Sequence, residues 1–156
     1  MRCGGKHVLF VICVVVACGG AWAAEQAEAD KKEIKKEGQT IVSRPSDYKV
    51  IKQDWGELAW MVSRELKNSE TLTVGKGVIK PGCESPRHSH PNCDEVLHVV
   101  KGRILHSMEG GKKVEMSEGD TISIPANIVH NAKNIGKEDA LLIMCFSTAD
   151  RKVVNE

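Results

Sequence analysis

The chain has 156 residues, which is about the size of one domain. Its 41% hydrophobic and 28% charged residues exclude a wholly disordered chain, a collagen-like fibre and a polytopic membrane protein. The net charge of +1 implies no broad basic surface, and three Trp, one Tyr and two Phe leave few aromatic platforms for stacking bases. Nucleic acid is therefore not expected as a partner.

The first 23 residues have the layout of a secretory signal peptide. Arg2 and Lys6 form a short positive start, residues 8–18 are an uncharged apolar run, and small residues stand at Ala21 and Ala23. The apolar run is shorter than the ~20 residues that a spanning helix needs. We therefore expect this segment, residues 1–23, to be removed and the protein to be secreted or periplasmic.

The N-terminal segment has two other interpretations. Residues 15–18 resemble the lipobox of bacterial lipoproteins, in which Cys18 would be lipidated and would hold the protein at a membrane. An uncleaved anchor or a buried N-terminal helix is the remaining alternative. Residues 24–45 are expected to be a polar linker, because Ile34 is the only large apolar side chain between residues 24 and 40.

From residue 41 onward, short apolar or β-branched runs alternate with Gly, Pro, Asn and charged clusters. This pattern predicts an all-β domain, an antiparallel barrel or sandwich over residues 46–150, followed by a tail at 151–156. The predicted strands cover 57–63, 71–80, 94–100, 103–108, 121–124, 128–133 and 140–147. The sequence has neither a Gly-rich phosphate loop nor the flanking glycines of a serine nucleophile elbow.

Metal-ligand residue types are concentrated between residues 82 and 95. His88 and His90 would face one side of an extended segment, Glu95 begins the next strand, and His130 lies on a later apolar run. A His-x-His pair alone is commonly two unpartnered surface histidines. Three imidazoles and one carboxylate suit a divalent first-row ion, and they do not distinguish Mn, Fe, Ni or Zn.

The spacing of these residues resembles the two motifs of the cupin superfamily. The first motif is matched at every fixed position, by Gly82, His88, His90, Glu95 and Gly102. The second is matched at four of five positions, by Gly119, Pro125, His130 and Asn134, with Asn127 in place of a glycine. Because Asn tolerates positive φ best after Gly, we expect this exchange to preserve the turn.

The resemblance implies a small jelly-roll β-barrel with a metal ion inside. It assigns His88, His90, Glu95 and His130 as the metal ligands and Asn134 as a structural residue. The turn and framework residues would be Gly82, Gly102, Gly119 and Pro125. A cupin that had lost its metal would be expected to show substituted ligands, and none of the four is substituted. The resemblance also implies a homodimer.

Several further side chains near the motifs have open roles. Cys93 is expected to be buried, with a Cys83–Cys93 disulfide as an alternative, and Cys145 is expected in the core. Arg87 is expected on the surface, with a substrate-carboxylate contact as an alternative. His98 is expected outside the barrel, because it lies three residues from Glu95 on one strand. Trp55 and Trp60 are expected in packing or subunit contacts, and His106 is a candidate for the cavity wall.

The function implied by the resemblance is a metal-dependent enzyme of dioxygenase, isomerase or decarboxylase type acting on a small polar or carboxylate-bearing metabolite. The fold alone does not name the reaction, and no catalytic residue beyond the metal ligands can be assigned. A non-enzymatic protein that binds or senses a small molecule or a metal is the alternative. A structural partner in an envelope complex is a third possibility.

Overall fold

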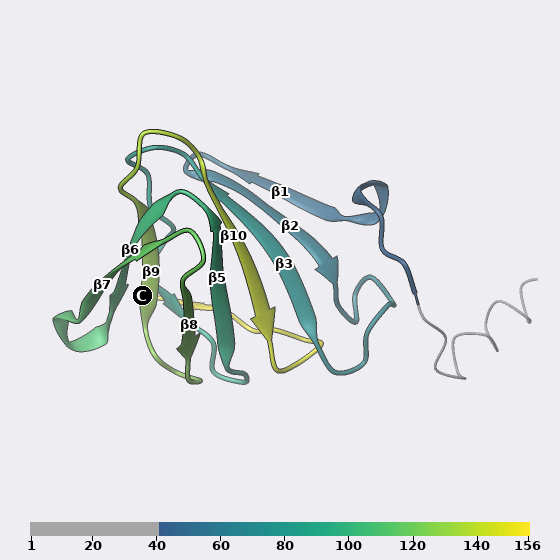
Figure 1. The fold of residues 1–156 in the computed structure, drawn as a ribbon. Coiled ribbons are helices and arrows are strands. Elements are labelled where there is room, and N and C mark those ends of the chain that lie inside the picture. The colour runs from purple at the N-terminus through teal and green to yellow at the C-terminus, as the bar shows by residue number, and fades with distance from the viewer. Residues whose placement is uncertain (1–40) are drawn as a thin grey trace, which may run out of the picture. The chain divides into compact units, whose positions relative to one another are not determined.

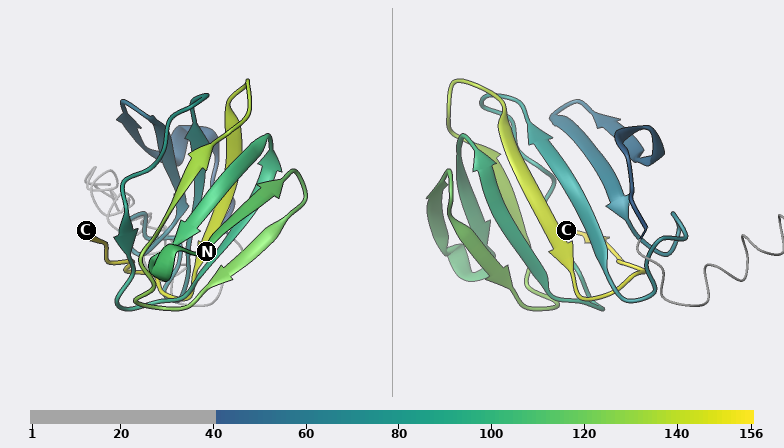
Figure 2. Two further views of the ribbon diagram at one scale, coloured as in Figure 1. Left: turned by 90° about the vertical axis from the view of Figure 1, so that its left-hand side faces the viewer. Right: turned by 45° about the vertical axis from the view of Figure 1, so that its right-hand side comes forward.

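Residues 41–156, which the computed structural model describes, form two antiparallel β-sheets. Figures 1 and 2 show the sheets facing each other as two layers. One sheet has the strand order β1-β2-β3-β10-β5-β8 and the other has the order β11-β4-β9-β6-β7. The strands cover Lys49–Gln53 (β1), Gly56–Val62 (β2), Thr73–Ile79 (β3), His88–Ser89 (β4), Glu95–Lys101 (β5), Arg103–Met108 (β6), Lys113–Ser117 (β7), Thr121–Ile124 (β8), His130–Asn134 (β9), Ala140–Phe146 (β10) and Val154–Asn155 (β11). The predicted all-β jelly-roll is confirmed.

Two short 3₁₀ turns, Pro45–Asp47 (η1) and Glu109–Gly111 (η2), accompany the strands. Within residues 41–156 the structure contains no helix with the length and apolar character needed to cross a bilayer. The predicted signal peptide, the lipidation site at Cys18 and most of the predicted linker lie outside these residues.

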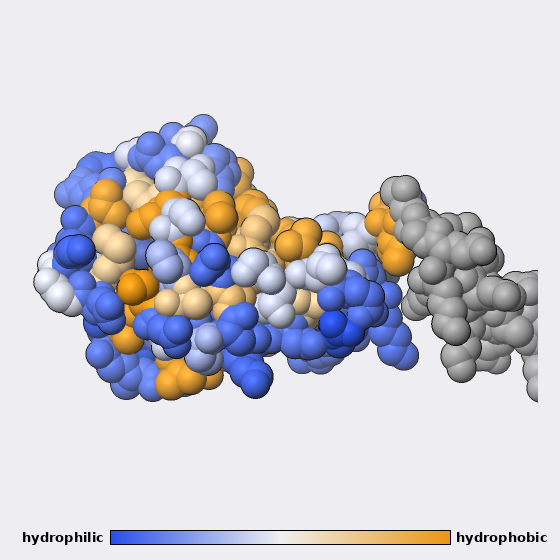
Figure 3. Space-filling view, turned by 90° about the horizontal axis from the view of Figure 1, so that it is seen from below, coloured by the Kyte–Doolittle hydropathy of each residue, from blue (hydrophilic) through white to orange (hydrophobic). Residues whose placement is uncertain are grey.

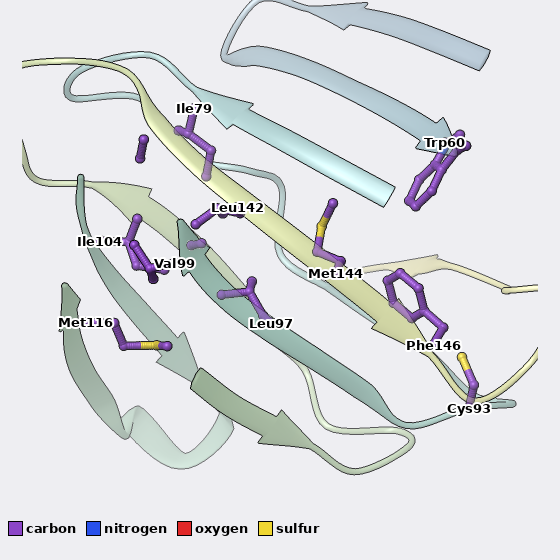
Figure 4. Close-up of a cluster of buried hydrophobic side chains, with 12 residues drawn as sticks. Trp60, Ile79, Cys93, Leu97, Val99, Ile104, Met116, Leu142, Met144 and Phe146 are labelled. Atoms are coloured by element: carbon purple, nitrogen blue, oxygen red, sulfur yellow. The ribbon is translucent and has the colours of Figure 1, made fainter. Parts of the chain in front are cut away.

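The core lies between the sheets and follows from the alternation of side chains along the central strands. In β3 and β10 buried residues alternate with more exposed ones, as a strand with one core-facing side requires. Figure 4 shows the cluster that results, which includes Trp60, Leu97, Leu142, Met144 and Phe146. Burying each such apolar side chain contributes ~1.5–3 kcal/mol to folding.

Cys145 was expected in the core, and this expectation is wrong. The side chain is exposed, because the neighbouring Met144 and Phe146 point inward and side chains alternate along β10. The sequence Leu-Leu-Ile-Met-Cys-Phe is apolar on both faces, so its composition does not reveal which face is buried.

The turn predictions at Asn127 and Gly102 hold. Asn127 has φ +68°, in the left-handed region that favours glycine and that Asn tolerates. Gly102 has φ +94°, and a Cβ atom there would lie 3.0 Å from the Cα of Ala140, so close approach of two backbones also requires glycine.

Asn134 is a structural residue, as expected. It is fully buried, and its Nδ2 donates hydrogen bonds to the carbonyl oxygens of Ile79 (2.7 Å) and Glu138 (2.8 Å). Its Oδ1 accepts a hydrogen bond from the backbone N–H of Gly136 (2.8 Å). The side chain therefore ties β9 to the end of β3 and to the turn before β10.

The C-terminal residues, expected as a tail, return to the second sheet. Val154 and Asn155 form β11, which pairs with β4 at Ser89 and His88. Asn92 holds the segment before β11 through two hydrogen bonds: its Nδ2 donates to the carbonyl of Asp150 (2.8 Å), and its Oδ1 accepts from the N–H of Lys152 (3.0 Å).

The outer surface carries apolar side chains interspersed among polar ones, as Figure 3 shows for the face seen from below. Near the N-terminal edge of the larger sheet, Ile41, Val42 and Val50 are 50%, 66% and 48% exposed. This edge is the outer side of β1, which has a neighbour on one side only within the described part of the chain.

Candidate metal centre

Four side chains of metal-ligand type meet at the ends of three strands. His88 lies in β4, His90 directly follows β4, Glu95 begins β5 and His130 begins β9. His88 and His130 face each other across the β4–β9 ladder. One ligand atom from each residue lies within 4.8 Å of the ligand atoms of the other three. The structure therefore brings together the four residues that the motif spacing singled out.

Each of the three histidines is held by its Nδ1 atom. The backbone carbonyl partners are Pro86 for His88 (2.8 Å), Lys152 for His90 (2.7 Å) and Ile128 for His130 (2.8 Å). A carbonyl oxygen only accepts, so each Nδ1 carries the proton and each Nε2 of the neutral ring presents a lone pair. This tautomer and anchoring are typical of histidines that bind a metal through Nε2.

Glu95 lies against two of these imidazoles. Its Oε2 is 3.1 Å from Nε2 of His130 and 3.2 Å from Nε2 of His90, and all three side chains are buried. Burial alone would raise the pKa of Glu95, but the two imidazoles outweigh burial and lower the pKa to about 2. The carboxylate is therefore ionised at neutral pH.

The pKa values of His88 and His130 move in opposite directions. Burial lowers the pKa of His88. Burial also acts to lower the pKa of His130, but the hydrogen bond and the charge of Glu95 raise it above its ordinary value. Burial therefore disfavours the charged form of His88, whereas Glu95 favours the charged form of His130.

The geometry fits a divalent ion. When each Nδ1 is protonated, two Nε2 lone pairs face one carboxylate oxygen, so a cation, either a proton or a metal ion, must lie between them. Two donor atoms each ~2.1 Å from one first-row ion and at right angles are about 3 Å apart, which matches the 3.1 and 3.2 Å separations at Glu95. Nε2 of His90 is buried and makes no hydrogen bond, although Oε2 of Glu95 lies 3.2 Å away, so its lone pair is available to a metal ion.

The cluster opens onto a cavity of about 80 Å³ between the sheets. Its wall is mostly apolar and includes Trp55, Trp60, Leu97, Leu142, Met144 and Phe146. Apart from the four cluster residues, the polar side chains in this wall are Ser85, His106 and Arg151. The two tryptophans were expected in packing, and the structure places them both in packing and at the cavity.

His106 lines the cavity, whereas the sequence did not show which face of its strand it occupies. It lies on β6, is 0% exposed and stacks on His130 with ring centroids 5.5 Å apart and an interplanar angle of 19°. Neither ring nitrogen has a hydrogen-bond partner. Burial, and then the charge of His130, lower the pKa of His106 to about 4, so the ring is neutral at pH 7.

The other residues considered in the sequence do not line the cavity. Nδ1 of His98 is 2.9 Å from the hydroxyl oxygen of Thr121 on the outer face of the sheet, as expected. Arg87 pairs with Glu156 at the surface. Cys93 is buried, as expected, and both Cys83 and Cys93 are free thiols, so the alternative disulfide is absent here.

Arg151 is a cavity residue that was not expected from the sequence. It was assigned to the tail, but its guanidinium carbon lies 4.3 Å from the ring centroid of Trp60 and 5.1 Å from that of Phe146. Nothing in the local sequence Ala-Asp-Arg-Lys indicates this position. It depends on the pairing of the C-terminal strand β11 with β4, which is a tertiary feature.

Comparison with known proteins agrees with this architecture. The family model for the cupin domain matches residues 75–146, which include His88, His90, Glu95 and His130. Germin-like protein 3-8 of Oryza sativa subsp. japonica is 34% identical over 86 residues, which cover 52% of this chain and 38% of that protein. Oxalate oxidase 1 of Hordeum vulgare is 32% identical over 94 residues, which cover 56% of this chain and 47% of that protein. The chain thus spans less than half the length of these relatives.

Solved structures share the fold at lower identity. The oxalate decarboxylase of Lactobacillus farciminis, in its formate complex, superposes with a TM-score of 0.68 at 19% identity, covering 78% of this chain and 40% of that chain. An uncharacterized protein with a double-stranded β-helix domain from Klebsiella pneumoniae gives a TM-score of 0.62 at 16% identity, covering 75% of this chain and 97% of that one. At these identities the likeness shows a shared fold alone.

Proposed function

The chain belongs to the cupin superfamily through residues 75–146, and on that premise we propose that it is a metal-dependent enzyme acting on a small carboxylate-bearing metabolite. The observation that carries the proposal is the buried cluster of three imidazoles and one ionised carboxylate beside a cavity. Such a cluster in a cavity wall has the features of a reaction site, since its pKa values are shifted by burial and by specific charge partners.

In this proposal His88, His90, Glu95 and His130 hold a divalent transition-metal ion. When bound, the ion would supply Lewis-acid or redox chemistry at positions that the four protein ligands leave open. Glu95 offsets part of its charge, and the carbonyl-anchored Nδ1 atoms keep the imidazoles oriented. The apolar wall restricts access of water, which strengthens charge interactions within the cavity.

Size and relatives together suggest the substrate class. The cavity of about 80 Å³ is far below the ~300–1,000 Å³ of sites for drug-sized ligands, so the substrate has few non-hydrogen atoms. The relatives and neighbours include proteins named for oxidising or decarboxylating oxalate. We therefore take oxalate and similarly small acids as the first substrates to test.

His106 is assigned to hydrogen-bond the bound ligand. Its two ring nitrogens are buried without partners, and an unpaired buried polar group costs ~1–3 kcal/mol. A ligand or an ordered water in the cavity would remove that cost. Because the ring is neutral, it can donate from one nitrogen and accept at the other.

A non-enzymatic binding protein is the second candidate, and one observation favours it. Among the described residues Glu95 is the only carboxylate in the cavity wall, and the proposal uses it as a metal ligand, so no second carboxylate is available as a general base. A binding protein would bind the acid at the same metal without converting it.

Turnover separates the two candidates. Full-length protein loaded with Mn²⁺ or Fe²⁺ is incubated with oxalate and other small acids, while oxygen uptake, carbon dioxide and product are recorded. An enzyme converts at least one acid, and His90→Ala abolishes conversion while the surface variant His98→Ala retains it. Binding without conversion of any acid would favour the second candidate, and equal activity of both variants would contradict the assigned site.

We also propose secretion and self-association. Secretion is supported by the layout of residues 1–23, and N-terminal sequencing with intact mass of the mature protein tests cleavage against lipidation at Cys18. A homodimer is supported by the exposed apolar side chains Ile41, Val42 and Val50 at the β1 edge. Light scattering of the purified protein tests it, and a monomer at all concentrations would contradict it.

A further inference from the structure

Arg151 is a cationic side chain in the wall of the cavity that has no anionic partner among residues 41–156. No salt bridge or hydrogen bond of its guanidinium is formed within these residues, whereas Arg64, Arg87 and Arg103 each pair with a carboxylate at the surface. Arg151 instead lies over the rings of Trp60 and Phe146. Burial lowers its pKa, with Glu95 acting in the opposite direction, but an arginine remains charged at neutral pH.

The backbone on both sides of Arg151 is fixed relative to the metal-ligand cluster. Asn92 bonds to the carbonyl of Asp150 and to the N–H of Lys152, the residues that flank Arg151. The carbonyl of Lys152 accepts the hydrogen bond from Nδ1 of His90 (2.7 Å). The chain therefore couples the position of the arginine directly to a proposed ligand of the metal.

The aromatic rings connect Arg151 to the same ligand. The ring of His90 lies 4.9 Å from the ring of Phe146, which is itself below the guanidinium. Figure 4 shows Trp60 and Phe146 at the same end of the core. Stacking on two rings orients a guanidinium but leaves its N–H donors free for an anion.

From these contacts we propose that Arg151 binds an anionic carboxylate of the substrate while the metal-ligand cluster binds its other end. The proposal rests on the proposed function, because it places the substrate in the same cavity. Arg151 lines both this cavity and the neighbouring hollow formed with Ser63, Thr73 and Lys152, so it lies at a boundary between the cavity and the surface. Arg151 would then select small acids over their neutral analogues as they enter.

The alternative is a purely structural role, in which Arg151 only packs on the two aromatic rings. In that case its loss would change stability without changing the preference for anionic ligands. A cation that binds a carboxylate makes charge-assisted hydrogen bonds that an amide of similar shape does not restore. Discrimination between acid and amide is therefore the quantity that separates the two roles.

The test uses full-length wild-type protein, Arg151→Gln, Arg151→Lys and the matched surface control Arg103→Gln. Metal content is measured first by elemental analysis, so that loss of the metal, which bears on the proposed function, is recorded separately. Binding of oxalate, oxamate and the neutral diamide oxamide is then measured by calorimetry, both with Mn²⁺ and in metal-free protein.

We expect wild type and Arg103→Gln to prefer oxalate over oxamide. Arg151→Gln should bind oxalate about 10- to 100-fold more weakly, with oxamide unaffected, and Arg151→Lys should recover part of the preference. Unchanged oxalate affinity in Arg151→Gln would overturn the proposal. It would also be overturned if wild type bound oxalate no better than oxamide, or bound neither, whatever its metal content.

Discussion

His106 makes the stability of the metal-free protein depend on pH in a way that can be calculated from the structure. In the unfolded chain its pKa is 6.5, and in the folded chain burial lowers it to about 4. Between these values the unfolded state binds a proton that the folded state does not bind, so stability falls as the pH drops from 6.5 to 4. The difference of about 2.5 corresponds to about 3 kcal/mol, since each unit of pKa is worth ~1.4 kcal/mol.

The substitution His106→Leu replaces the titrating ring with an apolar side chain of similar size. Chelator-treated wild type, His106→Leu and the control His98→Gln are unfolded with urea at a series of pH values from 7 to 4. The free energy of unfolding of His106→Leu should fall less over this interval than that of wild type, by up to about 3 kcal/mol.

Comparison with the variant is needed because other groups titrate nearby. The lowered pKa of His88 acts in the same direction as His106, whereas the raised pKa of His130 acts in the opposite direction. Both residues remain in His106→Leu, so most of their contribution cancels in the difference. His98→Gln should follow wild type. If His106→Leu and wild type had parallel pH profiles, a neutral, buried and unpaired His106 would be refuted.

Two further predictions concern the framework of the site. Asn134→Ala should lower the free energy of unfolding by about 2–4 kcal/mol, because it leaves the carbonyls of Ile79 and Glu138 without their buried partner. Urea unfolding measures this loss. A loss below about 1 kcal/mol would contradict the structural role of Asn134. Gly102→Ala should lower the free energy of unfolding by about 1–3 kcal/mol, because the new side chain would be held at positive φ and would contact Ala140. Asn127→Gly should stay within about 1 kcal/mol of wild type. Equal effects of the two variants in thermal unfolding would contradict these roles of the two turns.

Strands that face the core could be predicted from the sequence because alternation and β-branched residues mark them. Each of the seven predicted runs overlaps one strand of the structure, with the ends differing by at most two residues. The edge strands β1 and β7 were missed, since their side chains are mostly exposed and their sequences, Lys-Val-Ile-Lys-Gln and Lys-Val-Glu-Met-Ser, are largely polar. The two-residue strands β4 and β11 are set by tertiary pairing alone.

The clustering of His88, His90, Glu95 and His130 could be predicted because their spacing is a local property of two motifs. His106 and Arg151 could not be assigned in the same way. The face of His106 depends on the register of β6 against β9, where it pairs with Ala132. The position of Arg151 depends on hydrogen bonds to Asn92, which is 59 residues earlier in the chain.

Metal binding by His88, His90, Glu95 and His130 can be measured directly. The full chain is produced without an affinity-tag metal column, and its metal content is measured by elemental analysis beside His90→Ala, His130→Ala and the outer-face control His98→Ala. We expect about one divalent transition-metal ion per chain in wild type and His98→Ala, and loss of most of it in the other two variants. Unchanged metal content in His90→Ala and His130→Ala, or a wild-type protein that binds no transition metal even when it is supplied, would contradict the account.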